Sequence, residues 1–509
     1  MLKKILFFLG LGCLLLSGAH AQAPSLRSGA QAPALLSPND LKIVYFGSSV
    51  PFGQGATAKY GYPSRYSALL AQRATAGQGA PWTTANISVP GDNTVAVLNR
   101  WARDLTPQGG RYVVLALALG NEGIHGGGQP KFDQFRVNMQ QLIAQARAQG
   151  LVPVVTNSYT RNDYTTEDYA FIRQMNLLLH SWAVPTVNLL GAVDDGTGHW
   201  VPGYWDDALH PNDRGHAELF HAWVPSLFDA LRAGKPLPHY QATAGVRLAA
   251  RGSALRFVPE ALVHPFTQVI SFRSASPGRL LALQDSTNAG SLSIEASGLL
   301  VYKSAKTGQI TSAARVADNR WHQAVLTHYF ARGETVLYLD GRRVGNLPEQ
   351  LRTRYLTLGG RLAPAGGQYR NWLFYRAGMN ADEVHALATD SLLKSSLELY
   401  APLDGRQRAA PDSLANLAQS TNVVVRVPSP RPSSPRSSTS VLNRWPPTNT
   451  NIPRPVRNDP SGNNRFSTRC LKDGSYVRLK DATLTSVAGA MPTTCCFPYP
   501  SQKSIPTRW

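Results

Sequence analysis

A serine and an Asp-x-x-His pair are the residues of this sequence whose types and positions could do nucleophilic chemistry. Ser49 stands in a Gly-Ser-Ser turn directly after an apolar run, where a serine would lie at the carboxyl edge of a strand beside the free N–H groups of the next helix. Asp207 precedes His210 by three residues. A carboxylate at this spacing can fix the imidazole tautomer and stabilise the imidazolium that forms when the ring takes a proton from serine. Each signal alone is weak, because such turns and helix-capping aspartates are common.

Two further segments could supply hydrogen-bond donors to the negative charge that forms when a serine attacks a carbonyl group. Gly91 stands in a Val-Pro-Gly-Asp-Asn segment, and Asn121 follows Gly120 at the end of a long apolar run. A glycine N–H and a side-chain amide at neighbouring strand ends can both point at a developing oxyanion. Either segment is weak by itself, so the four segments have to be judged together.

The elements that must position these residues follow an alternating pattern. Between residues 41 and 232, short apolar runs alternate with stretches of helical periodicity, which predicts a parallel sheet covered by helices on both faces. The predicted strands are 41–46, 112–119, 152–156 and 186–190, and the clearest helical spacing is that of Phe132, Phe135, Met139, Leu142, Ile143 and Ala146.

The last helix of this region is expected to begin after Pro211 and to end near Gly234. His216 and His221 on this helix are five residues apart, so they do not share a face, and we interpret them as ordinary helix residues. The apolar side of the helix is expected to carry Leu219, Phe220, Trp223, Leu227 and Leu231.

The four segments, in this order and at predicted strand ends, resemble the four sequence blocks of the SGNH (GDSL-like) hydrolases. The resemblance implies an α/β fold, a flavodoxin-like parallel sheet with helices on both faces. It implies that Ser49 is the nucleophile, that His210 is the general base and that Asp207 orients His210. It also implies an oxyanion hole formed by the N–H groups of Ser49 and Gly91 and the side chain of Asn121, and a reaction that needs no metal and no organic cofactor.

The resemblance covers roughly residues 40–232 and departs from the family pattern in two blocks. Ser48 stands where the serine block usually has an aspartate, and Glu122 stands where the asparagine block usually has one. In the asparagine block one residue usually separates the glycine from the asparagine, whereas here Gly120 immediately precedes Asn121. The histidine block fits in full.

Residues 243–405 have a different pattern, short alternating runs punctuated by Gly, Asp and Asn, which predicts an all-β sandwich. The clearest hairpin follows residues 335–339 and turns at Asp340-Gly341, a pair that favours a tight primed turn. This region resembles the laminin G-like, concanavalin A-type sandwiches, notably at residues 321–325. The resemblance implies a domain that binds glycans, binds proteins or only braces a neighbouring enzyme, and it leaves these alternatives open.

The two ends of the chain differ from the body. Residues 1–21 contain two lysines, a short apolar run and an Ala-x-Ala cleavage site, the pattern of a signal peptide. The run is shorter than the roughly 20 residues that a spanning helix needs, so we expect no membrane span and a secreted or periplasmic protein after cleavage near Ala21. Residues 425–509 are expected to be a low-complexity basic tail, either a disordered or wall-associated segment or a stretch that is out of frame.

The net charge of +20 would by itself suggest a polyanionic partner. Residues 421–509 hold 13 Lys or Arg against three acidic residues, so the tail carries half of this charge. The body has no basic stripe interleaved with aromatic residues, and we expect no nucleic-acid partner. The four cysteines lie in the predicted signal peptide and in the last forty residues, so no zinc site built on thiolates is expected in the body.

The sequence therefore predicts a secreted serine esterase with an ester substrate, most plausibly an acetylated glycan. One alternative is a lipase or a general short-chain esterase, and another is an inactive glycan-binding protein on a hydrolase fold, which the substituted serine block favours. We expect an SGNH hydrolase domain at residues 40–235, and we expect residues 22–235 to fold alone while residues 243–405 matter mainly on polymeric substrates. The alternative is that the sandwich packs against the hydrolase domain and stabilises it.

Overall fold

The structure is a computed structural model that describes residues 38–248, 253–285, 288–389, 391–404 and 413–428. It also describes the backbone of three short strands, β21 (Arg469–Cys470), β22 (Tyr476–Lys480) and β23 (Thr483–Ser486), which pair with one another in a unit separate from residues 1–432. The predicted signal peptide and most of the predicted tail lie outside the described residues. Among the described residues, no helix is both long and apolar enough to cross a membrane.

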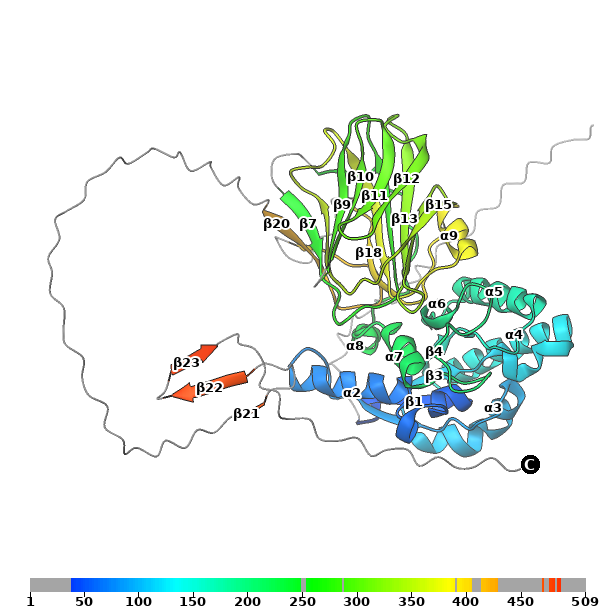
Figure 1. Ribbon diagram of the computed structural model, residues 1–509. Helices are drawn as coiled ribbons and strands as arrows, with labels where there is room; N and C mark the ends of the chain where they lie inside the picture. Colours follow the sequence, from blue (N-terminus) through cyan, green and yellow to red (C-terminus); the bar gives the residue numbers. More distant parts are fainter. Residues whose placement is uncertain are drawn as a thin grey trace, which may run out of the picture. The chain divides into compact units, whose positions relative to one another are not determined.

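Five parallel strands form the sheet of the first region, in the order β2-β1-β3-β4-β5 (Figure 1). This is the flavodoxin-like order, and it confirms the predicted fold class. One strand was not predicted, the edge strand Thr83–Asn86, because its four polar or small residues form no apolar run. The strands are β1 (Lys42–Gly47), β2 (Thr83–Asn86), β3 (Tyr112–Ala116), β4 (Val152–Thr156) and β5 (Thr186–Val187).

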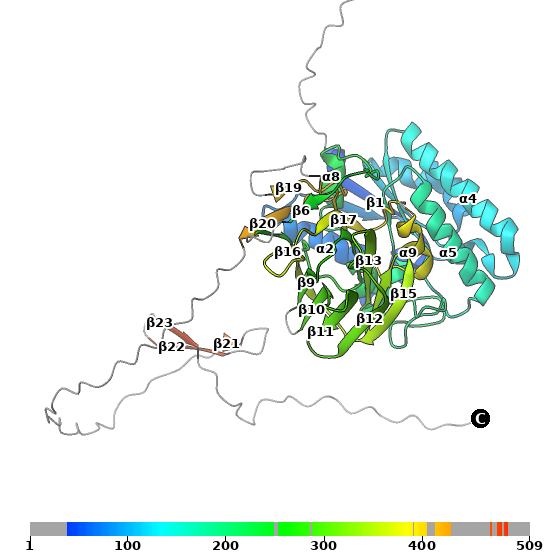
Figure 2. The same cartoon turned by 90° about the horizontal axis from the view of Figure 1, so that it is seen from above.

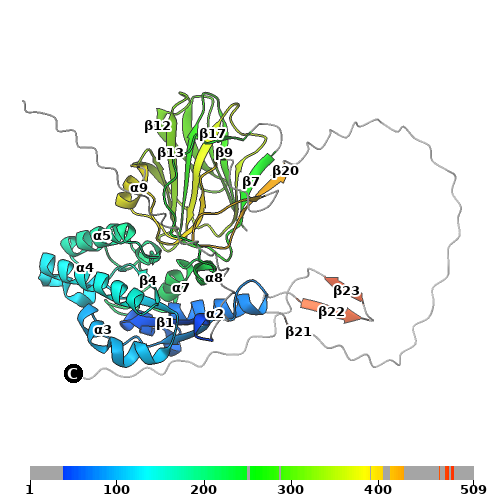
Figure 3. The same ribbon diagram turned by 180° about the vertical axis from the view of Figure 1, so that it is seen from behind.

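Helices cover both faces of this sheet, and the alternation of side chains along the strands decides which residue faces which helix layer (Figure 3). Val44 and Phe46 pack with α3 (Thr94–Arg100), α4 (Ile124–Ala148) and α5 (Thr166–Ser181). Ile43 and Tyr45 pack on the other side with α2 (Tyr62–Thr75), α7 (Asp213–His221) and α8 (Leu227–Arg232). Shorter helical turns are α1 (Ser49–Phe52), α6 (Leu190–Val193), η1 (Pro38–Leu41), η2 (Thr57–Lys59), η3 (Trp101–Leu105), η4 (Thr106–Gln108) and η5 (Leu119–Glu122).

The prediction of one last helix from Pro211 to Gly234 is wrong, because the structure has two helices there, α7 and α8. Pro225 lies between them. Its ring disfavours helical geometry at the preceding residue, and it has no N–H to continue the helical ladder. The apolar periodicity nevertheless places Leu219, Trp223 and Leu227 in one core.

Two antiparallel sheets form the second region, and their facing side chains share one hydrophobic core, which makes this region a β-sandwich (Figure 2). The orders are β12-β11-β10-β9-β16-β7-β20-β19 in one sheet and β15-β14-β13-β8-β17-β18 in the other, with β6 pairing β17. The elements are β6 (Val246–Arg247), β7 (Ser253–Phe257), β8 (Phe266–Arg273), β9 (Gly278–Asp285), β10 (Ala289–Ile294), β11 (Leu299–Ser304), β12 (Gly308–Arg315), β13 (Trp321–Tyr329), β14 (Glu334–Leu339), β15 (Arg342–Pro348), β16 (Thr353–Gly359), β17 (Gln368–Tyr375), α9 (Ala381–Ala388), β18 (Leu397–Ala401), β19 (Ser413–Leu414) and β20 (Val424–Pro428).

The predicted hairpin turn is present between β14 and β15. Asp340 has φ 51° and Gly341 has φ 77°, the left-handed pair that a primed turn requires. Leu339 pairs with Arg342 across it.

The sandwich continues beyond the predicted end at residue 405. The β-branched run at residues 423–425 lies at the start of β20, which pairs with β7 inside the larger sheet. The predicted tail from residue 425 therefore begins within a strand of the sandwich. The sequence did not reveal this strand, because the valine run is short and lies directly before the polar, proline-rich sequence.

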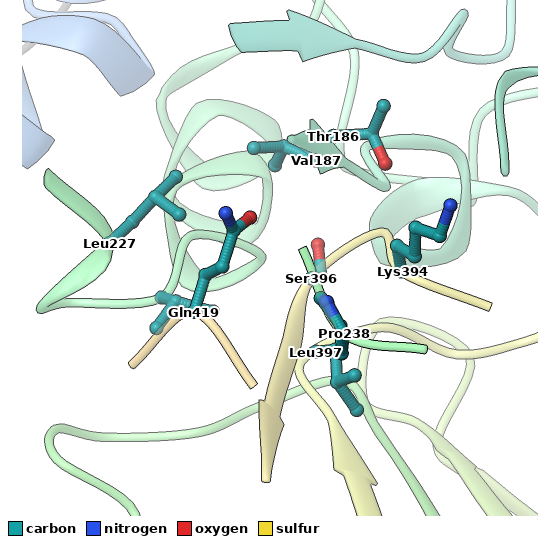
Figure 4. Close-up of a pocket in the computed structure, with 9 residues that line it drawn as sticks. Thr186, Val187, Leu227, Pro238, Lys394, Ser396, Leu397 and Gln419 are labelled. Carbon is teal, nitrogen blue, oxygen red and sulfur yellow. The ribbon is translucent and has the colours of Figure 1, made fainter. Parts of the chain in front are cut away.

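The sandwich covers the β5 edge of the parallel sheet. The N–H of Ser396 donates to the carbonyl of Thr186 at 3.0 Å, and the Nδ2 of Asn188 donates to Glu383 Oε1 at 2.7 Å. Thr186, Lys394, Ser396 and Leu397 are among the residues that line a remaining cavity of about 10 Å³ (Figure 4), which is about enough room for one water. These contacts favour a bracing role for the sandwich, because the edge of a sheet presents backbone groups that need partners.

Arg376 is the buried charge at this junction. Its side chain pairs with Glu398 at 2.8 Å, its Nε donates to the carbonyl of His221 in α7 at 2.9 Å, and a third bond reaches the carbonyl of Leu262 at 2.5 Å. The side chains of Arg376 and Glu398 are 2% and 0% exposed. The guanidinium of Arg376 therefore joins the sandwich to α7 of the first region.

We predict that Arg376→Met lowers the free energy of unfolding of the full chain by about 3–5 kcal/mol, because it leaves Glu398 charged and buried without its guanidinium partner. Urea unfolding measures the loss. Arg103→Met is the matched control, since Arg103 is 75% exposed in its pair with Asp104 and such surface pairs contribute little. Equal losses in the two variants would contradict the role of Arg376.

Candidate active site

The structure brings Ser49, His210 and Asp207 into one hydrogen-bonded row. The Nε2 of His210 lies 2.9 Å from the Oγ of Ser49. The Nδ1 of the same ring lies 2.8 and 2.9 Å from the two carboxylate oxygens of Asp207. Ser49 is 6% exposed and His210 is 8% exposed, whereas the Asp207 side chain is 51% exposed, so the row runs from a buried serine to a carboxylate at the surface. A serine, imidazole and carboxylate in this order are the arrangement that activates a serine hydroxyl.

Ser49 is held in place by the tight turn between β1 and α1. Ser48 is extended, with φ −108°, and α1 ends after one turn at Gly53, which has φ 99° and donates back to the carbonyls of Ser49 and Val50. Gly47 is required before the turn, because a Cβ there would lie 2.1 Å from the carbonyl oxygen of Ala116 on β3. The close approach of two strands therefore fixes where the serine emerges.

The Asp207 carboxylate also organises the loop that carries it. Its Oδ1 accepts from the backbone N–H groups of Leu209 at 2.8 Å and His210 at 2.9 Å. Partial burial raises the pKa of Asp207, but hydrogen bonds from His210 and these N–H groups outweigh it and hold that pKa below its ordinary value. Asp207 therefore stays ionised in mildly acidic solution. The neighbouring Asp206 has an exposed side chain, and its backbone N–H bonds to the carbonyl of His210.

His216, read from the sequence as an ordinary helix residue, supports the serine turn. Its Nδ1 accepts from the N–H of Tyr62 at 3.3 Å, so its Nε2 carries the proton and donates to the carbonyl of Gln54 at 2.9 Å. Burial lowers the pKa of His216 to about 4, which keeps the ring neutral. Because it lies in α7, six residues after a His210 that precedes the helix, its spacing gave no signal of this role.

The predicted oxyanion donors lie on adjacent loops. Gly91 has φ 86°, and the side-chain Nδ2 of Asn121 donates to the carbonyl of the following residue, Asp92, at 3.1 Å. An amide nitrogen has two N–H groups, so a second one remains for another acceptor. This bond joins the asparagine segment to the glycine segment.

Arg161 sets the orientation of the Asn121 amide, and sequence reasoning missed it. Its Nη1 donates to the Oδ1 of Asn121 at 3.2 Å. Because arginine has donors alone, Oδ1 must face it, and Nδ2 then faces Asp92. Asp163 holds the same guanidinium through two bonds of 2.9 and 2.5 Å. Tyr164 and Arg161 together leave room only for a glycine directly before Asn121, since a Cβ on Gly120 would lie 2.5 Å from the Tyr164 hydroxyl and 2.7 Å from the Nη1 of Arg161.

Glu122, the substituted acid of the asparagine segment, is buried and joins two loops. Its carboxylate accepts from the N–H of Thr94 at 3.0 Å and from the Thr94 hydroxyl at 2.6 Å, at the start of α3. Gln134 donates to the same carboxylate at 2.6 Å. The longer acid therefore ties the segment of Asn121 to the helix that follows Gly91.

Arg100 connects the serine turn to the Gly91 loop beneath it. Its guanidinium pairs with Asp92 at 2.5 Å and donates to the carbonyl of Ile87 at 2.8 Å. A longer contact of 3.4 Å reaches the carbonyl of Gly47, two residues before Ser49. Arg100 therefore contacts the turn in which Ser48 replaces the aspartate that the serine block usually has.

Among the described residues, no group of three or more His, Cys, Asp or Glu side chains is arranged to hold a metal ion. The chemistry that these residues can do by themselves is activation of a serine hydroxyl by an imidazole, beside N–H groups that can bind negative charge.

Comparison with known proteins identifies the first region of the chain. Residues 45–218 match the model of the GDSL-like Lipase/Acylhydrolase family, which confirms the predicted GDSL-like hydrolase domain. The comparison with curated proteins found no match. Among solved structures, the chain is similar to a GDSL-like lipase from Bacteroides thetaiotaomicron, with 14% identity over 38% of this chain and 88% of that chain and a TM-score of 0.29. It is also similar to a catalytic mutant of Axe2, an acetylxylan esterase from Geobacillus stearothermophilus, with 15% identity, 36% and 91% coverage and a TM-score of 0.30.

We predict that a fluorophosphonate probe labels Ser49, because His210 can take the proton from its hydroxyl. Ser49→Ala should lose the label, and Ser48→Ala, the matched control, should keep it. Gel fluorescence and peptide mass spectrometry read the result. Loss of the label in Ser48→Ala alone would show that Ser48 is the nucleophile, and persistent labelling of Ser49→Ala would contradict the role of Ser49.

Proposed function

We propose that the GDSL-like hydrolase domain is a serine esterase that acts on carboxylic esters, with Ser49 as nucleophile, His210 as general base and Asp207 as its orienting acid. The observation that carries this proposal is the 2.9 Å contact between the Ser49 hydroxyl and the Nε2 of His210, with Asp207 on the other ring nitrogen. An inactive hydrolase fold would have no need of this row.

In the proposed reaction the Oγ of Ser49 attacks the ester carbonyl carbon while the Nε2 of His210 takes the hydroxyl proton. The carbonyl oxygen becomes negative, and the N–H groups of Ser49 and Gly91 and the Nδ2 of Asn121 bind it. The carbon–oxygen bond to the alcohol then breaks, and His210 gives its proton to the leaving oxygen. Water, deprotonated by His210, hydrolyses the acyl-serine and restores the hydroxyl.

For the substrate we propose an ester of a carbohydrate, with an acetyl group as the acyl part. The β-sandwich fused to the hydrolase domain and the composition of residues 1–21, which fits export, support this choice. A second candidate is a lipase or general short-chain esterase. It is favoured by exposed apolar side chains on the segments of the site, where Phe52 at the end of α1 is 36% exposed, Val89 43% and Trp205 42%.

Hydrolysis by the purified full chain tests the proposal. We expect release of acetate from acetylated polysaccharides and from nitrophenyl acetate, and little hydrolysis of long-chain nitrophenyl esters. Asp207→Asn should reduce kcat by about 10⁴, and the matched control Asp206→Asn should leave it unchanged, because the Asp206 side chain does not contact His210. Long-chain esters as the best substrates would favour the lipase alternative, and inactivity on all esters would contradict an esterase.

We predict that Arg161→Met lowers kcat on nitrophenyl acetate by up to about 10², the cost of a misplaced catalytic group, with little change in KM. Arg161→Lys should recover part of the loss, since an ammonium can still donate to the Oδ1 of Asn121. In an Asn121→Ala background, Arg161→Met should cost little more, because the two residues act through one amide. A lower melting temperature with unchanged kcat per labelled serine would show that Arg161 acts on stability alone.

A further inference from the structure

A cleft of about 460 Å³ lies where the hydrolase domain meets the sandwich, and we call it the interdomain cleft. The hydrolase domain contributes the first turns of α5 and residues 194–197, and the sandwich contributes β13, β14 and the start of α9. Figures 1 and 2 both show α5 beside α9. Its volume is within the range of about 300–1,000 Å³ that small-molecule sites occupy. Neither domain alone would form it.

On the sandwich side the wall is built around Arg332. The guanidinium lies 3.4 Å from the centroid of the Tyr329 ring. It also lies 3.4 Å from the carbonyl of Asp195 and 3.7 Å from the carboxylate of Glu334. The side chain is 19% exposed, so the packed arginine still presents part of its surface to the cleft.

The hydrolase side repeats this arrangement. Arg173 lies 5.0 Å from the centroid of the Tyr169 ring and pairs with Asp382 at 2.6 Å. The hydroxyl of Tyr169 donates to the carboxylate of Asp194 at 2.6 Å. Each wall therefore combines an aromatic ring, an arginine and a carboxylate.

This lining fits a neutral sugar better than an anion. Each arginine already has a carboxylate neighbour, so the cleft has no excess of positive charge. Sugar hydroxyls both donate and accept hydrogen bonds, and the cleft offers arginine and Asn380 donors, the Thr197 hydroxyl and the carboxylate of Asp194. Convergent polar groups beside aromatic walls are the usual composition of a ligand site.

A single loop and Arg161 connect the cleft to the proposed oxyanion donor Asn121. Residues 194–197 continue directly into Gly198, whose carbonyl accepts from the N–H of Arg161 at 3.1 Å. Arg161 in turn holds Asn121 at 3.2 Å. The loop of residues 194–198 therefore connects the wall of the cleft to the residue that holds Asn121.

We propose that the interdomain cleft binds a neutral glycan chain, at sugar units other than the one that carries the ester. This inference rests on the proposed function, which supplies the ester on that chain. It gives the sandwich a direct part in substrate binding, because Tyr329, Arg332 and Asn380 come from it.

Calorimetry on the full chain with Ser49→Ala tests binding without depending on hydrolysis. We expect at least one of xylohexaose, mannohexaose and cellohexaose to bind, and a galacturonate hexamer not to bind. Adding Ala381→Trp should weaken binding by at least about tenfold, because Ala381 is exposed at the cleft. Adding Ala144→Trp, on an exposed position of α4 outside the cleft, is the matched control and should change nothing.

Thr197→Trp fills the cleft from the opposite wall. It gives a second test of the loss of hexamer binding if Ala381→Trp alters folding. Failure of all three neutral hexamers to bind, or unchanged binding in both tryptophan variants, would overturn the proposal. Binding of the galacturonate hexamer in preference to the neutral ones would overturn it as well. Failure of the esterase proposal would be seen separately, as absence of hydrolysis by the unmodified chain whatever the calorimetry shows.

Discussion

The hydrogen bond between Ser49 and His210 joins two residues that are 161 positions apart. Its length depends on how β1 and the loop before α7 are fixed relative to each other. Gly47 allows β1 to approach β3 closely enough for the serine turn to emerge where it does, and His216 bonds from α7 to the loop after Ser49. The proposed chemistry therefore depends on a few buried contacts that set the distance between the Ser49 turn and the loop of His210.

The two departures from the usual sequence blocks are accommodated by neighbouring charged groups. Arg100 bridges the serine turn and the Gly91 loop, in the block that lacks its aspartate. Glu122 reaches Thr94 with two hydrogen bonds. These are charge-assisted bonds, which are stronger than neutral ones, and they hold the loops of the site against one another. The substituted blocks are therefore compatible with an organised site, and the substitution alone is poor evidence for an inactive fold.

Buried polar groups of the sandwich and the hydrolase domain hydrogen-bond to each other. This bears on the expectation from sequence that residues 22–235 fold alone. Thr186 and Asn188 on the β5 side bond to Ser396 and Glu383, and Arg376 reaches α7. Separating the two would leave these groups exposed to water in place of their present partners. Bracing and substrate binding are also compatible roles, because the same junction that stabilises the sheet edge forms the interdomain cleft.

The sequence by itself determined the parallel sheet and four of its five strands, because apolar periodicity and turn chemistry are local properties. It located Ser49, Asp207 and His210 through the resemblance of four ordered segments to known sequence blocks. It also located the hairpin at Asp340-Gly341. It missed the polar edge strand β2, the break at Pro225 and the roles of Arg161 and His216. The tertiary structure alone decided which arginine meets which carbonyl or carboxylate. Such pairs depend on side chains brought together from distant positions, and a single sequence contains no local pattern for a contact between residues 40 positions apart, such as that between Asn121 and Arg161.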